Sequence, residues 1–192
     1  GVEHAFRNAW LHVVSLITTT GSVLEDLKWW HPVMSFVFFS LLFCGASSGS
    51  TSGGIKIIRH LVLSKNALLE YKRMLHPNAL LRVRLDNELV RPKIISNVLV
   101  FLLTYLLVFF IGTLLMITIL PGFGFPLKEA ASLVATSLGN VGPSLGKSYG
   151  PVNTFHEIPL IGKYVLSIIM LIGRLEVFTV LIILTPYFWR EN

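Results

Sequence analysis

The sequence predicts an all-α integral membrane protein. Of its 192 residues 53% are apolar and only 14% are charged, whereas a soluble domain usually carries about 25% charged residues. Residues 94–120 form a run of 27 positions without a charge, which exceeds the roughly 20 residues that a helix needs to cross the hydrocarbon core. Two shorter apolar segments each precede a small polar run that contains glycine. Together these observations predict a repeated unit of helices and polar loops within a membrane.

Three long apolar segments define the predicted membrane helices. Residues 94–120 form the clearest one, and residues 160–189 form another, which is interrupted by Arg174 and a nearby glutamate. The third covers residues 31–69 and is broken by a stretch rich in Gly, Ser and Thr at 44–56. Because Gly and Ser both weaken a helix, we expect this third helix to stop inside the membrane and resume on the cytoplasmic side.

The charge distribution predicts the topology. Eight of the 16 basic residues lie in residues 59–93. A short basic loop between apolar spans follows the positive-inside rule, so we expect this segment in the cytoplasm and the protein to be multi-pass. The position of these basic residues is explained by membrane topology and does not indicate a nucleic-acid site, so we expect no nucleic-acid partner. The single cysteine, Cys44, excludes a disulfide within the chain.

Two segments are apolar but too short to span a membrane. They are predicted as short helices at 5–17 and 126–135, and each leads into a polar loop, at 18–22 (TTTGS) and 136–142 (TSLGNVG). Helices of this length suit re-entrant positions in a membrane. With residues 59–93 inside, both polar loops lie on the outer side.

These two loops form an internal repeat. Laying Thr18 on Thr136 also aligns Gly21 with Gly139. The repeated unit reads short helix, polar loop, spanning helix, and residues 94–120 supply a further spanning helix before the second copy. The first copy has no such preceding helix, so we expect the chain to be the C-terminal part of a longer polypeptide, with repeats missing from its N-terminal side.

The repeated loops are predicted to bind a monovalent cation. Irregular backbone at membrane depth survives where it is buried or lines an aqueous path, and successive carbonyls can replace the water shell of an ion. The loops carry no carboxylate, which favours K⁺ over a strongly hydrated divalent ion, and no other metal is expected. The alternative is a pair of ordinary turns between helices. The predicted filter residues are Thr18, Thr19, Thr20, Gly21, Ser22, Ser137, Leu138, Gly139, Asn140 and Val141.

The broken helix and Arg174 are predicted to form a gate at one depth in the membrane. A Gly-rich segment can reorder at low cost across a water-filled path, although it could instead be a packing seam of small residues. Arg174 lies near the bilayer midplane, where it is costly unless it faces protein or water. It is either an electrostatic barrier or part of a structural ion pair with Glu176 or a more distant group. The predicted gate residues are Gly45, Gly49, Ser50, Thr51, Gly53, Gly54, Lys56 and Arg174.

Three motifs spread along the chain resemble the Trk/Ktr/HKT superfamily of potassium transporters, and most closely the bacterial Trk-type pore subunit. They are GASSGSTSGGIKIIR (45–59), TSLGNVGPSLG (136–146) and GRLEVFTVL (173–181). The loop TTTGS (18–22) is similar to the family's third filter segment, but less closely.

The resemblance implies helix–pore loop–helix repeats, four in number, around a pseudo-fourfold axis. Residues 1–75 would be the third repeat without its first helix, residues 76–93 a basic cytoplasmic linker, and residues 94–192 the complete fourth repeat. It further implies potassium uptake across the bacterial inner membrane, a homodimer surrounded by lipid, and a cytoplasmic ring of nucleotide-binding regulatory subunits for which residues 59–93 are a docking surface. No covalently bound cofactor is implied, and nucleotide would act only through the regulatory partner.

Several alternatives to potassium uptake remain open on the sequence. The chain could be a Na⁺-permeable or Na⁺/H⁺-coupled member of the same superfamily, or a subunit of an ordinary tetrameric cation channel. Two unlike loops in one chain argue against the tetramer. An intramembrane enzyme is disfavoured because the histidines lack the HExxH spacing of a metalloprotease and no Asp/Glu pair lies at membrane depth.

Overall fold

A computed structural model describes residues 1–23, 31–76, 79, 81–85, 88–120, 126–146, 155–175, 177–184 and 188–189. Its elements are α1 (Val2–Ile17), α2 (Pro32–Leu41), β1 (Cys44–Gly45), β2 (Ile55–Lys56), α3 (Ile57–Leu75), β3 (Arg84–Leu85), β4 (Glu88–Leu89), α4 (Pro92–Ile119), α5 (Pro126–Gly139), the 3-10 helix η2 (Phe155–Glu157), α6 (Leu160–Arg174) and α7 (Val177–Leu184).

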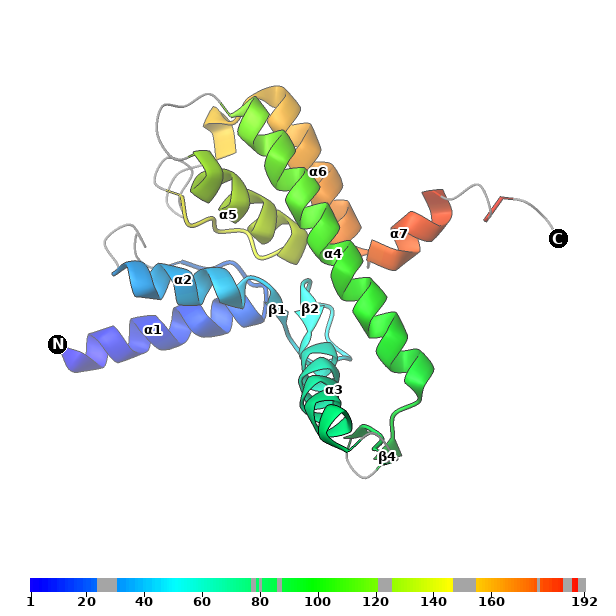
Figure 1. Ribbon diagram of the computed structural model, residues 1–192. Coiled ribbons are helices and arrows are strands. Elements are labelled where there is room, and N and C mark those ends of the chain that lie inside the picture. Colours follow the sequence, from blue (N-terminus) through cyan, green and yellow to red (C-terminus); the bar gives the residue numbers. More distant parts are fainter. Residues whose placement is uncertain are drawn as a thin grey trace.

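Helix α4 is the longest element and extends from α5 and α6 at one end toward α3 at the other (Figure 1). Among the described residues it is the one helix long and apolar enough to cross a membrane, and only 28% of its apolar window is buried. Its outward side chains include Leu103, Leu107 and Leu114. A helix that is apolar all round and still exposes most of its surface suits hydrocarbon better than water. It begins two residues before and ends one residue before the predicted 94–120 helix.

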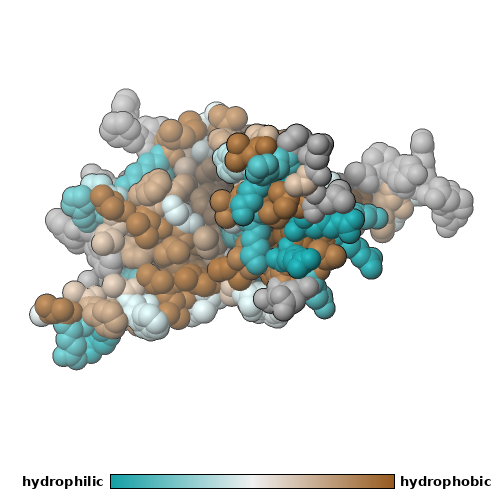
Figure 2. Space-filling view, turned by 60° about the horizontal axis from the view of Figure 1, so that its bottom comes forward, coloured by the Kyte–Doolittle hydropathy of each residue, from teal (hydrophilic) through white to brown (hydrophobic). Residues whose placement is uncertain are grey.

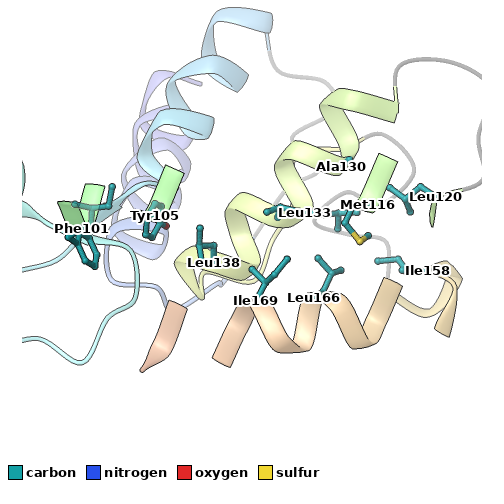
Figure 3. Packing of buried hydrophobic residues seen from close by; sticks show 12 residues of the cluster. Phe101, Tyr105, Met116, Leu120, Ala130, Leu133, Leu138, Ile158, Leu166 and Ile169 are labelled. Atoms are coloured by element: carbon teal, nitrogen blue, oxygen red, sulfur yellow. The ribbon is translucent and has the colours of Figure 1, made fainter. Parts of the chain in front are cut away.

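The main core lies between α4, α5 and α6, and Figure 3 shows side chains of α5 and α6 that face one another in it. Leu133 and Leu138 of α5 are fully buried, as is Met116 of α4. Leu166 and Ile169 of α6 face them across the cluster. Because lipid tails are as apolar as these side chains, close packing stabilises this interface in a membrane more than transfer from water does. This core fixes the position of the C-terminal end of α5.

A second, smaller cluster joins α1 and α2 to the same region of α5. Leu16 of α1 packs with Phe38 and Leu42 at the end of α2. Ala135 of α5 and Val141 of the following loop complete the cluster. In Figure 1 the two helices lie side by side next to α5. The ends of α1 and α5, where the predicted filter loops begin, are therefore brought together.

The last apolar segment is two helices and not the single helix predicted at 160–189. Helix α6 ends at Arg174, and Leu175 adopts φ −82° and ψ 9° as its C-cap. Helix α7 then leads away from α6 and packs against α4 (Figure 1), with the rings of Phe178 and Phe101 5.8 Å apart. The break falls where Arg174 interrupts the apolar run, although this interruption was predicted to lie within one helix.

Two short strand pairs interrupt the helices. β1 and β2 pair in parallel across the broken helix, and β3 and β4 form an antiparallel hairpin within the predicted linker 76–93. Helix α3 extends to Leu75, beyond the predicted end at residue 69. Figure 2 looks toward the end of the molecule where α3 and this hairpin lie, and hydrophilic residues gather there beside apolar surface.

Candidate functional site

The loops that follow α1 and α5 have positive φ angles at the same spacing. Thr19 and Asn140 both adopt a left-handed conformation, with φ 55° and 54°. Two positions later Gly21 and Gly142 also have positive φ, 77° and 109°. Positive φ is uncommon outside glycine, so the same alternation in both loops identifies equivalent positions.

Hydrogen bonds at the helix ends repeat at the same offset. The amide of Thr20 donates to the carbonyl of Ser15 at 3.0 Å, and the amide of Val141 donates to the carbonyl of Thr136 at 2.9 Å. Each bond spans one residue more than an α-helical bond, so it closes the helix with a wider turn. The chain therefore turns out of α1 and α5 in the same way.

The structure corrects the predicted register of this repeat. Gly21 corresponds to Gly142, three residues after the predicted partner Gly139. The reason is that α5 continues through Gly139, so the polar loop starts later than the sequence suggested. Ser137 and Leu138, both predicted as filter residues, are buried within α5. Their carbonyls belong to the helix and not to an extended loop.

Hydroxyl groups at equivalent positions hold both loops. The hydroxyl of Ser15 donates to the carbonyl of Ser22 at 2.8 Å. In the second loop the hydroxyl of Thr136 accepts a hydrogen bond from the amide of Gly142 at 3.0 Å. A hydroxyl group in the last turn of each short helix thus holds the loop backbone six or seven residues further along the chain.

The remaining predicted residues of the first loop lie at its surface. Thr18, Thr20 and Ser22 are exposed, and Thr19 and Gly21 are half-buried. The hydroxyl of Thr18 lies 2.9 Å from that of Thr20. This loop therefore places the hydroxyls of Thr18 and Thr20 outside the protein core.

The two loops lie against each other. A Cβ atom built on Gly21 would overlap the carbonyl oxygen of Val141 and lie 3.5 Å from the ring of Pro143. A Cβ on Gly142 would lie 3.8 Å from the Cα of Gly21. The repeat therefore brings two similar loops together as adjoining walls of one site.

The broken helix forms a hydrogen-bonded loop between α2 and α3. Its two ends pair as β1 and β2, and the Lys56 ammonium donates to the carbonyls of Ser50 and Ser52 at 2.6 and 2.5 Å. The hydroxyl of Ser52 accepts from the amide of Ala46 at 3.1 Å. Lys56 therefore fastens the inside of the loop and does not point away from it, as a lysine at the mouth of a path would.

The other predicted gate residues divide between the tip and the base of this loop. Gly49 and Thr51 are exposed at the tip, whereas Gly45 and Gly53 are buried at the base. Gly54 has positive φ, 72°. The tip therefore has room to move, whereas the base is enclosed by other backbone.

Three segments enclose the C-terminal end of α5 by backbone contact. A Cβ on Gly53 of the intramembrane loop would overlap the carbonyl oxygen of Gly139, and a Cβ on Gly139 would lie 2.7 Å from the carbonyl oxygen of Leu42. On the α6 side, a Cβ on Gly173 would overlap the carbonyl oxygen of Leu138. Real Cβ atoms do not approach other atoms below 3.0 Å. The loop between α2 and α3 and helix α6 thus lie directly against the helix that precedes the second predicted filter loop.

Arg174 follows Gly173 and is the last residue of α6. Its side chain is exposed, and it forms no hydrogen bond or ion pair with another residue that the structure describes. The predicted partner Glu176 lies outside the described residues. Gly173, the residue before Arg174, meets the same end of α5 as Gly53 does. The placement of Arg174 at the membrane depth of the broken helix stays a prediction.

Comparison with known proteins gives consistent matches along the whole chain. The family model described as "TrkH: Cation transport protein" matches residues 2–189. The Trk system potassium uptake protein TrkH of Halomonas elongata is 36% identical over 185 residues, which are 96% of this chain and 37% of that protein. TrkH of Escherichia coli K12 is 37% identical over 185 residues, again 96% of this chain and 37% of that protein. TrkG of the same organism is 32% identical over 188 residues, 97% of this chain and 37% of that protein.

A solved structure matches the fold. The crystal structure of the potassium transporter TrkH from Vibrio parahaemolyticus superposes with a TM-score of 0.88 at 35% sequence identity. It covers 99% of this chain and 39% of that chain. The predicted fold class, an all-α membrane protein, is therefore confirmed, and so is the resemblance to the Trk-type pore subunits. The chain spans less than two fifths of the length of these relatives.

Proposed function

Because the chain belongs to the TrkH family of cation transport proteins, we propose that it supplies one partial and one complete repeat of a pathway for potassium uptake. Its relatives in Halomonas and Escherichia are named as potassium uptake proteins. The proposed setting is the bacterial inner membrane, with the two loops on the outer side and residues 59–93 in the cytoplasm.

The observation that carries this proposal is the pair of loops with one backbone conformation. Alternating positive and negative φ turns successive carbonyls toward one side, and such carbonyls can replace the hydration shell of K⁺. In the register of the structure, Thr19, Thr20 and Gly21 of the first loop correspond to Asn140, Val141 and Gly142 of the second. These six residues are the proposed filter contribution of this chain.

The intramembrane loop and Arg174 are proposed as the gate below this filter. The loop base rests on the carbonyl end of α5 through Gly53, and Lys56 holds the loop closed. A guanidinium group in a cation path raises the electrostatic barrier to permeation. In this proposal Arg174 limits flux when the loop is seated.

The complete transporter is proposed to contain further repeats, a second copy and a regulatory partner. Four repeats around a pseudo-fourfold axis would close the filter, and we use "complete transporter" for the protein in which all four are present. A homodimer and a cytoplasmic ring of nucleotide-binding subunits would complete the assembly. The basic segment 59–93 is the proposed docking surface for that ring.

Rubidium uptake into proteoliposomes that contain the complete transporter tests the proposed function. An excess of K⁺ should block rubidium uptake, whereas the same concentration of Na⁺ should inhibit it only weakly. Gly142→Ala should reduce selectivity, because alanine at φ 109° is strained even though a Cβ there would have space. Gly49→Ala is the matched control, since a Cβ built on Gly49 would meet no other atom within 4 Å and Gly49 does not have positive φ.

Three results would contradict parts of the proposal. Equal competition by Na⁺ would assign the chain to a sodium-permeable member of the family. Unchanged selectivity in Gly142→Ala would remove the second loop from the filter. Absence of flux from well-folded protein would reject transport altogether.

A further inference from the structure

A cavity lies at the end of the molecule where α3, the β3–β4 hairpin and the start of α4 meet. Its volume is about 280 Å³. It opens at the boundary where the basic segment ends and the apolar surface of α4 begins. Its lining residues are Asn66, Arg73, Arg82, Val83, Val90, Pro92, Ile95, Ser96 and Leu99.

The walls of this cavity are held in place by specific hydrogen bonds. Two guanidinium nitrogens of Arg73 donate to the carbonyl of Leu81, at 3.2 and 2.6 Å, and so attach the chain before the hairpin to α3. The amide of Val90 donates to the carbonyl of Val83 at 2.9 Å and closes the hairpin. The side chain of Val83 is only 1% exposed. The cavity is therefore part of the fold and not a gap between loosely placed loops.

The polar groups around the cavity are suited to an anion. Arg82 is exposed and lines the cavity, and a guanidinium group can donate two parallel hydrogen bonds to a phosphate. The side-chain amide of Asn66 and the hydroxyl of Ser96 can also donate hydrogen bonds. None of the described lining residues is acidic. Of the described carboxylates close to the lining in sequence, that of Glu70 pairs with Arg73, and that of Glu88, two positions before Val90, is exposed and does not line the cavity.

The apolar groups around the cavity face the membrane side. Ile95 and Leu99 lie on the first turns of α4, just inside the predicted start of the membrane span. Leu99 is 42% exposed, and the exposed apolar surface of α4 continues beyond it through Val100 and Leu103. A molecule held at the cavity by an anionic group could therefore extend an acyl chain along α4 into the hydrocarbon.

We propose that this cavity binds the phosphate headgroup of an anionic phospholipid from the cytoplasmic leaflet. Basic pockets between membrane helices on the cytoplasmic side suit such headgroups. The surrounding segment, residues 59–93, holds eight of the 16 basic residues of the chain. The inference rests on the proposed topology, in which this segment is cytoplasmic, and is independent of which cation is transported.

Native mass spectrometry of the complete transporter in detergent tests this inference. The probes are dioleoylphosphatidylglycerol and the zwitterionic dioleoylphosphatidylcholine, each added at matched concentration. The wild-type protein should retain the anionic lipid in preference. Arg82→Gln should weaken its retention about fivefold, the change expected when one basic residue near an anionic lipid is lost.

The matched control is Arg84→Gln. Arg84 lies two positions further along, is also exposed, and does not line the cavity. It should leave lipid retention unchanged, although it removes the same charge. An equal loss in both variants would attribute binding to diffuse charge and overturn the cavity site.

Two further outcomes would also overturn the proposal. Displacement of the lipid by millimolar inorganic phosphate would indicate a site for free anions. Loss of regulatory-subunit binding in Arg82→Gln, with lipid retention unchanged, would assign the cavity to a protein partner. Since lipid retention is measured without ion flux, failure here leaves the proposed transport function untouched, and failure of transport leaves this test intact.

Discussion

Replacement of Gly53 by alanine tests whether the intramembrane loop is seated on the end of α5. A Cβ at this position would overlap the carbonyl oxygen of Gly139 and lie 2.8 Å from its carbonyl carbon, and 3.1 Å from the Cβ of Asn140. The nearest obstacles are backbone atoms, so rotation of a side chain cannot relieve the overlap. Gly53 does not have positive φ, and the effect of the substitution is therefore steric and not conformational.

The expected magnitude follows from this geometry. The loop and α5 must separate by about 1 Å before the new methyl group reaches normal van der Waals distance. Overpacking of this kind typically costs about 1–3 kcal/mol. If the seated loop closes the path, the same energy shifts the ratio of closed to open states by a factor of about 5 to 150. Gly53→Ala should therefore lower thermal stability and raise basal rubidium flux.

The assay pairs thermal unfolding of the complete transporter with rubidium uptake into proteoliposomes. Gly49→Ala serves as the control, because it adds the same methyl group at the loop tip with no atom within 4 Å. If Gly53→Ala behaves like this control in both measurements, the contact with Gly139 does not exist in the transporter. If stability falls while flux is unchanged, the contact exists but the loop is not the gate.

Three other substitutions probe the same region. Lys56→Met removes the ammonium that binds two loop carbonyls, and should raise basal rubidium flux, since hydrogen bonds to charged groups contribute about 1.5–3 kcal/mol. Asn140→Ala loses the hydrogen bond to the Met170 carbonyl at 3.1 Å and strains a residue at φ 54°. It should lower the free energy of unfolding by about 1–3 kcal/mol, and Asn140→Gly should recover the conformational part. Arg174→Ala should increase flux if the guanidinium is a barrier, whereas a lower yield of folded protein with unchanged flux would indicate a structural ion pair.

The fold class was predictable because its signals, a low share of charged residues and a long charge-free segment, extend over many residues. The charge-free run at 94–120 is long enough to specify a membrane helix by itself. The charged interruption at Arg174 marked the place where the last apolar segment divides, but it did not predict a break, because α6 and α7 are both apolar and no proline separates them. Beyond the break α7 makes a tertiary contact, in which the ring of Phe178 meets that of Phe101 on α4.

The repeat was predictable, but its register was not. Matching letters placed Gly21 on Gly139, whereas the backbone pairs Gly21 with Gly142. A signal was present in the second loop, since Asn140 and Gly142 are both residue types that tolerate positive φ. In the first loop the equivalent of Asn140 is Thr19, a β-branched residue for which φ 55° is a true outlier. The shared spacing of positive-φ positions was therefore not recognisable in the sequence of the first loop.

The glycines of the broken helix include one that makes a close backbone contact. A Gly/Ser-rich stretch predicts flexibility, and the sequence left a gate and a packing seam as alternatives. In the structure, Gly53 meets Gly139 backbone to backbone, and Gly173 meets the carbonyl of Leu138 from the other side. The loop is thus non-helical and also closely packed, and its role as a gate stays a prediction. Because its base has no spare room whereas its tip at Gly49 does, motion of this loop requires the base to leave α5, and that step is the one that Gly53→Ala perturbs.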